Sequence, residues 1–133
     1  MRKLGYLTSI CMCMVACDTQ PSTIPIRNVN FNVSINATNL VHIGGYEYFT
    51  GGISGIVIYR FDMTTFYAYD RACSYDWEEG GRVSVVDLKL YDSLCKSSFN
   101  LLNGYPYTGS KAKQPLRQYQ AKLIDDITLQ VYN

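Results

Sequence analysis

The sequence predicts an all-β domain, a small antiparallel sandwich or barrel that follows an N-terminal signal segment. Segments that alternate apolar and polar residues recur along the chain after residue 27, and such alternation is typical of half-buried strands. Turn residues separate these segments every eight to twelve residues or so, a spacing typical of sandwiches and barrels. Beyond the first sixteen residues, no segment shows the apolar period of a helix.

The expected strands follow one another closely along the chain. Residues 28–36 alternate most clearly, with Val29 and Phe31 on one face and Asn30 and Asn32 on the other. Segment 55–61 is apolar on both faces, which suits a central strand, and 65–69 is expected to return antiparallel to it. Residues 105–115 are expected to be irregular because they contain prolines. The remaining expected strands are 46–49, 82–87 and 89–92 (a pair or one bent strand), 99–102, and the hairpin of 118–124 with 127–132.

The N-terminus has the pattern of a secretion signal. Arg2 and Lys3 precede an apolar run that ends near Ala16 and is shorter than the roughly 20 residues needed to span a bilayer. The run ends in Met14-Val15-Ala16-Cys17, which resembles a bacterial lipobox. This resemblance implies that residues 1–16 are removed and that Cys17 carries the lipid, including palmitate-type acyl chains. The alternative is an ordinary signal peptide with an incidental cysteine.

A lipidated Cys17 would place the protein in the bacterial cell envelope, bound to the membrane through its anchor on a periplasmic or surface face, as at the outer membrane. Residues 17–27 are then expected to form a tether, and residues 28–133 a single domain. Without Arg2 and Lys3, ten of the 12 basic residues face 11 acidic ones. This near balance argues against nucleic acid as a partner.

Catalytic constellations are scarce. Serine or cysteine nucleophiles usually need a histidine base, and His42 is the single histidine of the chain. Asp76, Glu78 and Glu79 form an acidic segment that we expect to be solvated. These observations favour a protein that is not an enzyme.

Two cysteine-bearing loops resemble those of the Rieske iron–sulfur family, whose ligand motifs are C-x-H and C-x-x-H-G-S-x-F. The first loop here is Cys73-Ser74-Tyr75. In the second loop, Ser97 and Phe99 match the family's serine and phenylalanine, and Asn103-Gly104 matches the turn that follows. The resemblance covers roughly residues 44–133 and implies a β fold of the Rieske type.

The same alignment places Asp92 at the position of the second cysteine and Cys95 at that of the second histidine. In the alternative register Cys95 takes the place of the cysteine and Ser98 that of the histidine. The preferred register gives a degenerate set of ligand positions, namely Cys73, Tyr75, Asp92 and Cys95.

A Rieske cluster needs two cysteines on one iron and two histidines on the other. The resemblance therefore implies a degenerate 2Fe–2S site, and we expect no cofactor and no bound metal. The protein would then be a membrane-anchored, non-catalytic binding or assembly module with an unidentified protein partner. The alternative is an electron-transfer protein with a divergent iron–sulfur or other metal centre, because thiolates with a carboxylate could hold zinc or iron.

The resemblance also implies that Cys73 and Cys95 lie close together, since the two ligand loops meet at one end of a Rieske domain. An exported protein is in an oxidising compartment, where such pairs form disulfides. We therefore expect a Cys73–Cys95 disulfide. The alternative is two separate buried thiols.

Overall fold

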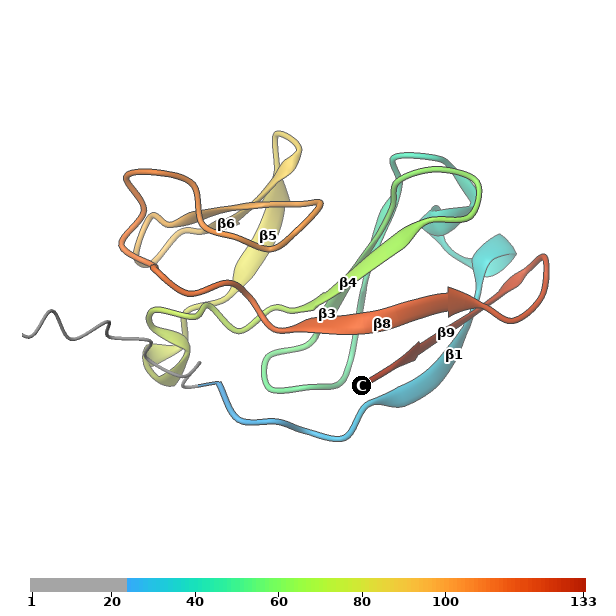
Figure 1. The fold of residues 1–133 in the computed structure, drawn as a ribbon, viewed down its shortest axis with the longest axis horizontal. Helices are drawn as coiled ribbons and strands as arrows, with labels where there is room; N and C mark the ends of the chain where they lie inside the picture. Colours follow the sequence, from blue (N-terminus) through green and yellow to red (C-terminus); the bar gives the residue numbers. More distant parts are fainter. Residues whose placement is uncertain (1–23) are drawn as a thin grey trace, which may run out of the picture.

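A computed structural model describes residues 24–133, and it confirms the all-β fold class. All strand pairs in this part of the chain are antiparallel. The strands form one six-stranded and one three-stranded sheet, which lie end to end in Figure 1. Residues 1–23, with the predicted signal segment and Cys17, lie outside the described residues.

The large sheet forms most of the domain, and its strand order is β1-β9-β8-β4-β3-β2. In chain order its members are β1 (Asn30–Ser34), β2 (Tyr46–Phe49), β3 (Ile56–Arg60), β4 (Phe66–Asp70), β8 (Gln118–Leu123) and β9 (Thr128–Tyr132). Strand β3 is an interior strand between β4 and β2, which agrees with its two apolar faces, and its Ile56, Val57 and Ile58 are all 0% exposed. Strands β8 and β9 form the predicted hairpin.

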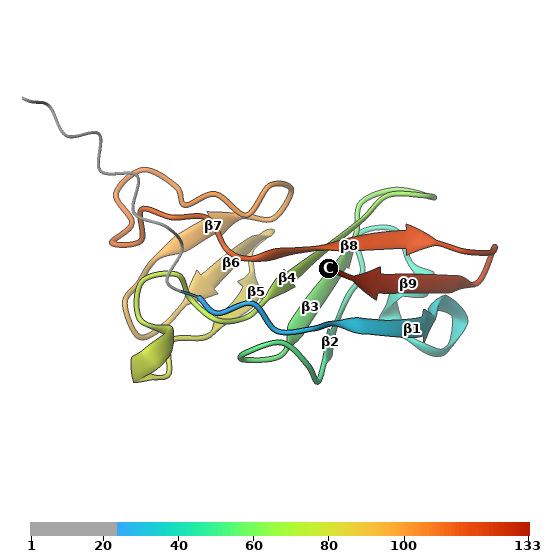
Figure 2. The same cartoon turned by 60° about the horizontal axis from the view of Figure 1, so that its bottom comes forward.

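The small sheet carries the two cysteine loops at its end of the molecule. It consists of β5 (Val83–Val86), β6 (Lys89–Asp92) and β7 (Ser98–Asn100), in that order. The first two strands pair antiparallel, which settles the choice between a strand pair and one bent strand. Figure 2 shows this sheet beyond one end of the large sheet, with β1, β8 and β9 at the other side.

Two apolar clusters form the core, and β3 contributes to both. Successive side chains of a strand point to opposite faces, so Ile58 packs in the cluster under the large sheet with Leu40 and Leu129. Val57 points the other way, into a cluster with Leu90 and Phe99 of the small sheet. Cys73 and Cys95 belong to this second cluster, so the cysteine loops are held by the packing between the two sheets.

A polar joint fixes the small sheet to the edge of the large one. The guanidinium of Arg71 lies over the ring of Tyr48, 3.9 Å from its centroid. Its Nε donates to the carbonyl oxygen of Val83 at 2.8 Å, and the backbone N–H of Val85 donates to the Tyr48 hydroxyl at 3.0 Å. These contacts therefore fix the orientation of β5 relative to β2 and the end of β4.

The structure adds local features that the alternation of residues did not predict. Three short 3₁₀ turns are present, η1 (Ile35–Ala37), η2 (Asn39–Val41) and η3 (Trp77–Glu79). One residue of the predicted tether packs against the domain: Ile24 is 2% exposed, and its carbonyl oxygen accepts from Arg117 at 2.6 Å. Within residues 24–133 there is no helix of the length and hydropathy that crossing a membrane requires.

Candidate metal centre

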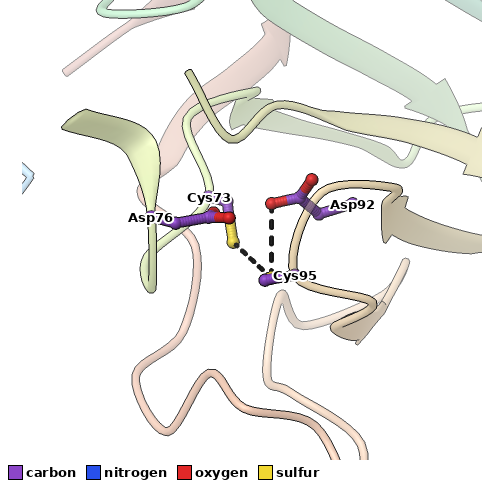
Figure 3. A group of neighbouring side chains, drawn as sticks. All are labelled: Cys73, Asp76, Asp92 and Cys95. Atoms are coloured by element: carbon purple, nitrogen blue, oxygen red, sulfur yellow. Dashed lines mark hydrogen bonds between the residues drawn. The ribbon is translucent and has the colours of Figure 1, made fainter. Parts of the chain in front are cut away.

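The second cysteine loop is a tight turn between β6 and β7. Asp92 ends β6, and its backbone N–H donates to the carbonyl oxygen of Ser97 at 3.0 Å. Its own carbonyl oxygen accepts from Lys96 at 2.9 Å, and its Oδ1 accepts from the N–H of Leu94 at 2.8 Å. Lys96 takes a positive φ of 65° to close the turn. The turn therefore holds Asp92 and Cys95 with their side chains on the same side, as Figure 3 shows.

The first cysteine loop leaves β4 and returns to β5 around η3. An isolated bridge between Ala72 and Arg82 closes its base. Just inside this bridge, the N–H of Cys73 donates to the carbonyl oxygen of Gly81 at 3.1 Å, and the N–H of Gly81 donates to that of Asp76 at 2.9 Å. These bonds bring both ends of the loop together, and the side chains of Cys73 and Asp76 face the second loop (Figure 3).

Four side chains from the two loops meet in a small group. One ligand atom from each of Cys73, Asp76, Asp92 and Cys95 lies within 4.8 Å of all the others. The two sulfur atoms are 3.7 Å apart, and the Sγ of Cys95 lies 3.4 Å from the Oδ2 of Asp92. All four residues are buried, Asp92 at 1% exposure and Asp76 at 7%. The group therefore combines two thiols and two carboxyls in a place largely shielded from water.

The Asp76 carboxyl is poorly satisfied in this position. Its Oδ1 is buried and has no hydrogen-bond partner among the described residues. The carboxyl lies against Gly81, where an added Cβ would collide with Oδ1 and come within 2.8 Å of the Oδ2 of Asp92. A glycine at position 81 is thus needed for space. An unpaired buried carboxylate oxygen is costly, so it calls for a proton or a cation.

Burial and mutual contacts change the protonation of the group. Burial raises the pKa of Cys73 well above its usual range, although the backbone N–H groups of Tyr75 and Asp76 partly oppose this. Burial and then a hydrogen bond with Asp92 raise the pKa of Asp76. Burial acts on Asp92 in the same direction, but the hydrogen bonds from Asp76 and Leu94 outweigh it, so the pKa of Asp92 is lowered. The pKa values of the two neighbouring carboxyls are therefore shifted in opposite directions.

The structure brings together three of the four predicted ligand positions, namely Cys73, Asp92 and Cys95. Tyr75 is 55% exposed, unlike the four buried members of the group. The fourth member is Asp76, which sequence reasoning placed in a solvated acidic segment. That expectation was wrong for Asp76, which is buried, although Glu78 and Glu79 are exposed. Cys73 and Asp76 have the same three-residue spacing as Asp92 and Cys95, and this repeated spacing was the feature of the sequence that could have identified Asp76 as a member of the group.

The remaining site predictions stand as follows. His42 is exposed, directly follows η2 and does not belong to the group. Ser98, the ligand position of the alternative register, is the first residue of β7, and its N–H donates to the Oγ of Ser110. Both cysteines are free thiols in this structure. The Cys73–Cys95 disulfide stays a prediction.

These residues do not fit a 2Fe–2S cluster of the Rieske type. Such a cluster needs two histidines on its second iron, and the chain's single histidine does not belong to the group. The four candidate ligand atoms also lie within 4.8 Å of one another. That is the spacing of ligands around one ion, whereas a cluster needs room for two irons and two bridging sulfides between its ligand pairs.

Comparison with known proteins adds the fold but no close relative. No protein family model and no curated protein matches the chain. A chain in the complex of reduced oxygenase and oxidized ferredoxin in carbazole 1,9a-dioxygenase matches with a TM-score of 0.55 and 15% identity, over 79% of this chain and 94% of that one.

Two further structures give similar values. The ferredoxin of carbazole 1,9a-dioxygenase from Nocardioides aromaticivorans IC177 has a TM-score of 0.51 and 18% identity, covering 80% of this chain and 97% of that one. A chain assigned as the small subunit of an NADH-dependent nitrite reductase from Mycobacterium tuberculosis has a TM-score of 0.50 and 14% identity, covering 81% and 97%. The chain therefore has a Rieske-like fold, similar to that of these ferredoxin-type domains.

Proposed function

We propose that this chain is a lipid-anchored protein of the bacterial cell envelope whose Rieske-like domain holds no 2Fe–2S cluster and serves as a binding or assembly module. One observation carries the proposal. At the end of the domain where the ligand loops meet, two cysteines and two aspartates stand in place of two cysteines and two histidines. A scaffold that keeps the loops but lacks the ligands for its cluster has lost the basis of one-electron transfer.

A role in binding agrees with the chemistry of the described residues. The candidate base His42 is exposed and is not a member of the group, and burial disfavours the Cys73 thiolate by raising its pKa. A thiol without a base and without thiolate character is a poor nucleophile. The buried group is thus suited to holding the loops in shape for a protein partner.

The second candidate is electron transfer through a divergent metal centre, which the paired thiols favour. The two readings differ in colour and in metal content. The mature protein, purified without oxygen, is expected to lack the visible absorption of an iron–sulfur centre and to contain neither stoichiometric iron nor acid-labile sulfide. A brown protein with both iron and sulfide would refute the cluster-free scaffold.

The membrane anchor is proposed from the lipobox-like residues Met14 to Cys17. Replacing Cys17 by Ala is expected to abolish labelling with a palmitate analogue and to release the protein from membranes or leave it uncleaved. The matched controls are Cys11→Ala and Cys13→Ala, which lie in the segment expected to be removed and should change nothing. A Cys17→Ala protein that is still lipid-labelled and membrane-bound would contradict the anchor.

A further inference from the structure

We propose that Cys73, Asp76, Asp92 and Cys95 bind one zinc ion, which joins the two loops at the end of the small sheet. The proposal deepens the role of this site as a scaffold, and it rests on the part of the proposed function that excludes a 2Fe–2S cluster. It also revises the expectation, drawn from the resemblance alone, that no metal is bound.

The spacing of the ligand atoms fits a single tetrahedral ion. With Zn–S bonds of about 2.3 Å, two sulfurs of a tetrahedral site are about 3.8 Å apart, and the sulfurs of Cys73 and Cys95 are 3.7 Å apart. All four ligand atoms lie within 4.8 Å of one another. Only small side-chain movements are needed to reach bonds of about 2.0–2.3 Å to one central ion.

The chemistry of the donors favours zinc over other divalent ions. Thiolates are soft ligands that calcium and magnesium do not select, whereas zinc accepts both cysteine sulfur and aspartate oxygen. The protein supplies all four ligands, and a closed tetrahedral site of this kind is typical of a structural ion rather than a catalytic one. The zinc would therefore fix the loops rather than activate a water.

The unpartnered oxygen of Asp76 is an independent sign that something is bound here. The residue is 7% exposed, and its Oδ1 has no hydrogen-bond partner in the part of the chain that the structure describes. Asp92 is arranged differently, because its Oδ1 already accepts from Leu94 while its Oδ2 faces the sulfur of Cys95. Asp76 thus keeps an unpartnered oxygen beside the thiols, while the Oδ2 of Asp92 accepts only from the Cys95 thiol, and a cation in the group would interact with both carboxyls.

A disulfide explains less of this arrangement. It would account for Cys73 and Cys95, but it would leave Asp76 and Asp92 buried beside an apolar bridge. A zinc ion accounts for all four side chains, and its two positive charges offset half of the four negative charges that the deprotonated ligands would carry. The groups around the ligands agree, since the Ser97 Oγ lies 3.1 Å from the Cys95 sulfur and accepts from the N–H of Ala112 at 3.0 Å. Such surrounding hydrogen bonds orient metal ligands.

The test uses the full-length mature protein, purified in detergent without oxygen and with its thiols reduced. Elemental analysis is expected to give one zinc per chain. After the zinc is stripped, titration with Co²⁺ is expected to give an intense thiolate-to-cobalt charge-transfer band with tetrahedral ligand-field absorption. Zinc added with a competing chelator gives the affinity, and circular dichroism confirms that each variant folds.

Asp76→Asn is the decisive variant, and Glu79→Gln is its matched control. Loss of a partner of a ligand typically weakens metal binding 10–100-fold, so loss of a direct ligand is expected to weaken zinc binding at least about 100-fold. Glu79 is an exposed acid on the same loop, and Glu79→Gln is expected to retain zinc with unchanged affinity. Equal affinities for the wild type and Asp76→Asn would overturn the ligand assignment.

The other outcomes separate this proposal from the function it rests on. Reduced protein that binds no zinc or cobalt, with a Cys73–Cys95 disulfide in the untreated sample by mass spectrometry, would overturn the zinc site and leave the cluster-free scaffold standing. Iron with acid-labile sulfide would overturn both. Iron without sulfide in place of zinc would overturn the choice of ion.

Discussion

Two buried carboxyls, Asp70 and Asp76, lie six positions apart along the chain and are treated in opposite ways by the fold. Asp70, the last residue of β4, is 0% exposed, and both of its oxygens are fully engaged. It accepts four hydrogen bonds of 2.7–3.1 Å, from the N–H groups of Ile53, Ser54 and Ala72 and from the Tyr119 hydroxyl. The Oδ1 of Asp76 has no partner among the described residues, and its neighbours are another carboxyl and two thiols.

The comparison shows that the two carboxyls differ in the kinds of groups that surround them. Donors converge on Asp70, so its charge is satisfied within the protein and ties a loop, β4 and β8 together. A second carboxyl and two thiols, which are weak donors, surround Asp76, and none of the described residues donates to its Oδ1. Both carboxyls press against a glycine, Gly52 and Gly81 respectively. The first is thus a structural joint, and the second is one side of a site for a cation.

The largest effect is expected from Asp70→Asn. The amide replaces one of the two acceptor oxygens with a donor, which leaves two of the four donors without a partner, at a cost on the order of 3–5 kcal/mol in the free energy of unfolding. Urea denaturation of the reduced protein measures the change. Asp126→Asn, in the exposed β8–β9 turn, is the control and should alter stability by less than about 0.5 kcal/mol.

Gly81→Ala should have the next largest effect. Its Cβ would collide with the Asp76 carboxyl and approach that of Asp92, and overpacking of this kind costs about 1–3 kcal/mol. The cost should shrink when Asp76 is also replaced by Ala, because the colliding group is then gone. A double-mutant cycle measures this coupling, and purely additive effects would show that Gly81 is needed for another reason.

Tyr119→Phe removes one of the donors to the Asp70 carboxyl, and it is expected to lower the free energy of unfolding by about 1 kcal/mol at neutral pH. Burial, and then the hydrogen bond to Asp70, raise the pKa of Tyr119 above its usual value. A raised pKa gives stability that is complete below the unfolded value of about 10 and is lost as pH rises above it. Wild type should therefore lose more stability than Tyr119→Phe between pH 9 and about 11. Parallel pH profiles would argue against this contribution.

The smallest effect, and one of opposite sign, is expected from Asp76→Asn in the reduced, metal-free protein. An amide can donate to Asp92 and removes one of two neighbouring acids, so the free energy of unfolding should rise by about 0.5–1 kcal/mol. Unfolding in the presence of a chelator measures it. A loss as large as that of Asp70→Asn would mean that Asp76 is satisfied in a way the described contacts do not include.

Local patterns accounted for the strands but not for the features that depend on contacts between distant segments. Residues 46–49 and 55–61 were predicted because alternation and apolar content act within a single strand. The turn η2 depends on the Thr38 side chain accepting from the N–H of Leu40, a local bond without a strong compositional signal. The packing of Ile24 was not predicted because the prolines and polar residues around it are typical of a linker.

Three of the four residues of the candidate site were predicted from the sequence. Alignment to the Rieske motifs singled out Cys73, Asp92 and Cys95, which the structure brings together. It assigned Tyr75 to the remaining position, because the motif places a ligand two residues after the cysteine. The path of the loop around η3 instead buries Asp76, three residues after Cys73, against Gly81. The same residues could form a solvated acidic segment or include a buried ligand, and only the path of the loop distinguishes the two.

The sequence by itself determined the all-β class, through the alternation within strands, and the lack of cluster ligands, since one histidine cannot supply two. The tertiary structure alone decided that Asp76 joins Cys73, Asp92 and Cys95, so that two loops about twenty residues apart place two sulfurs and two carboxyls within 4.8 Å of one another. The physical reason is that this convergence depends on Leu90 and Phe99 of the small sheet packing on Val57 of the large one. No residue's immediate neighbours in the chain encode that packing.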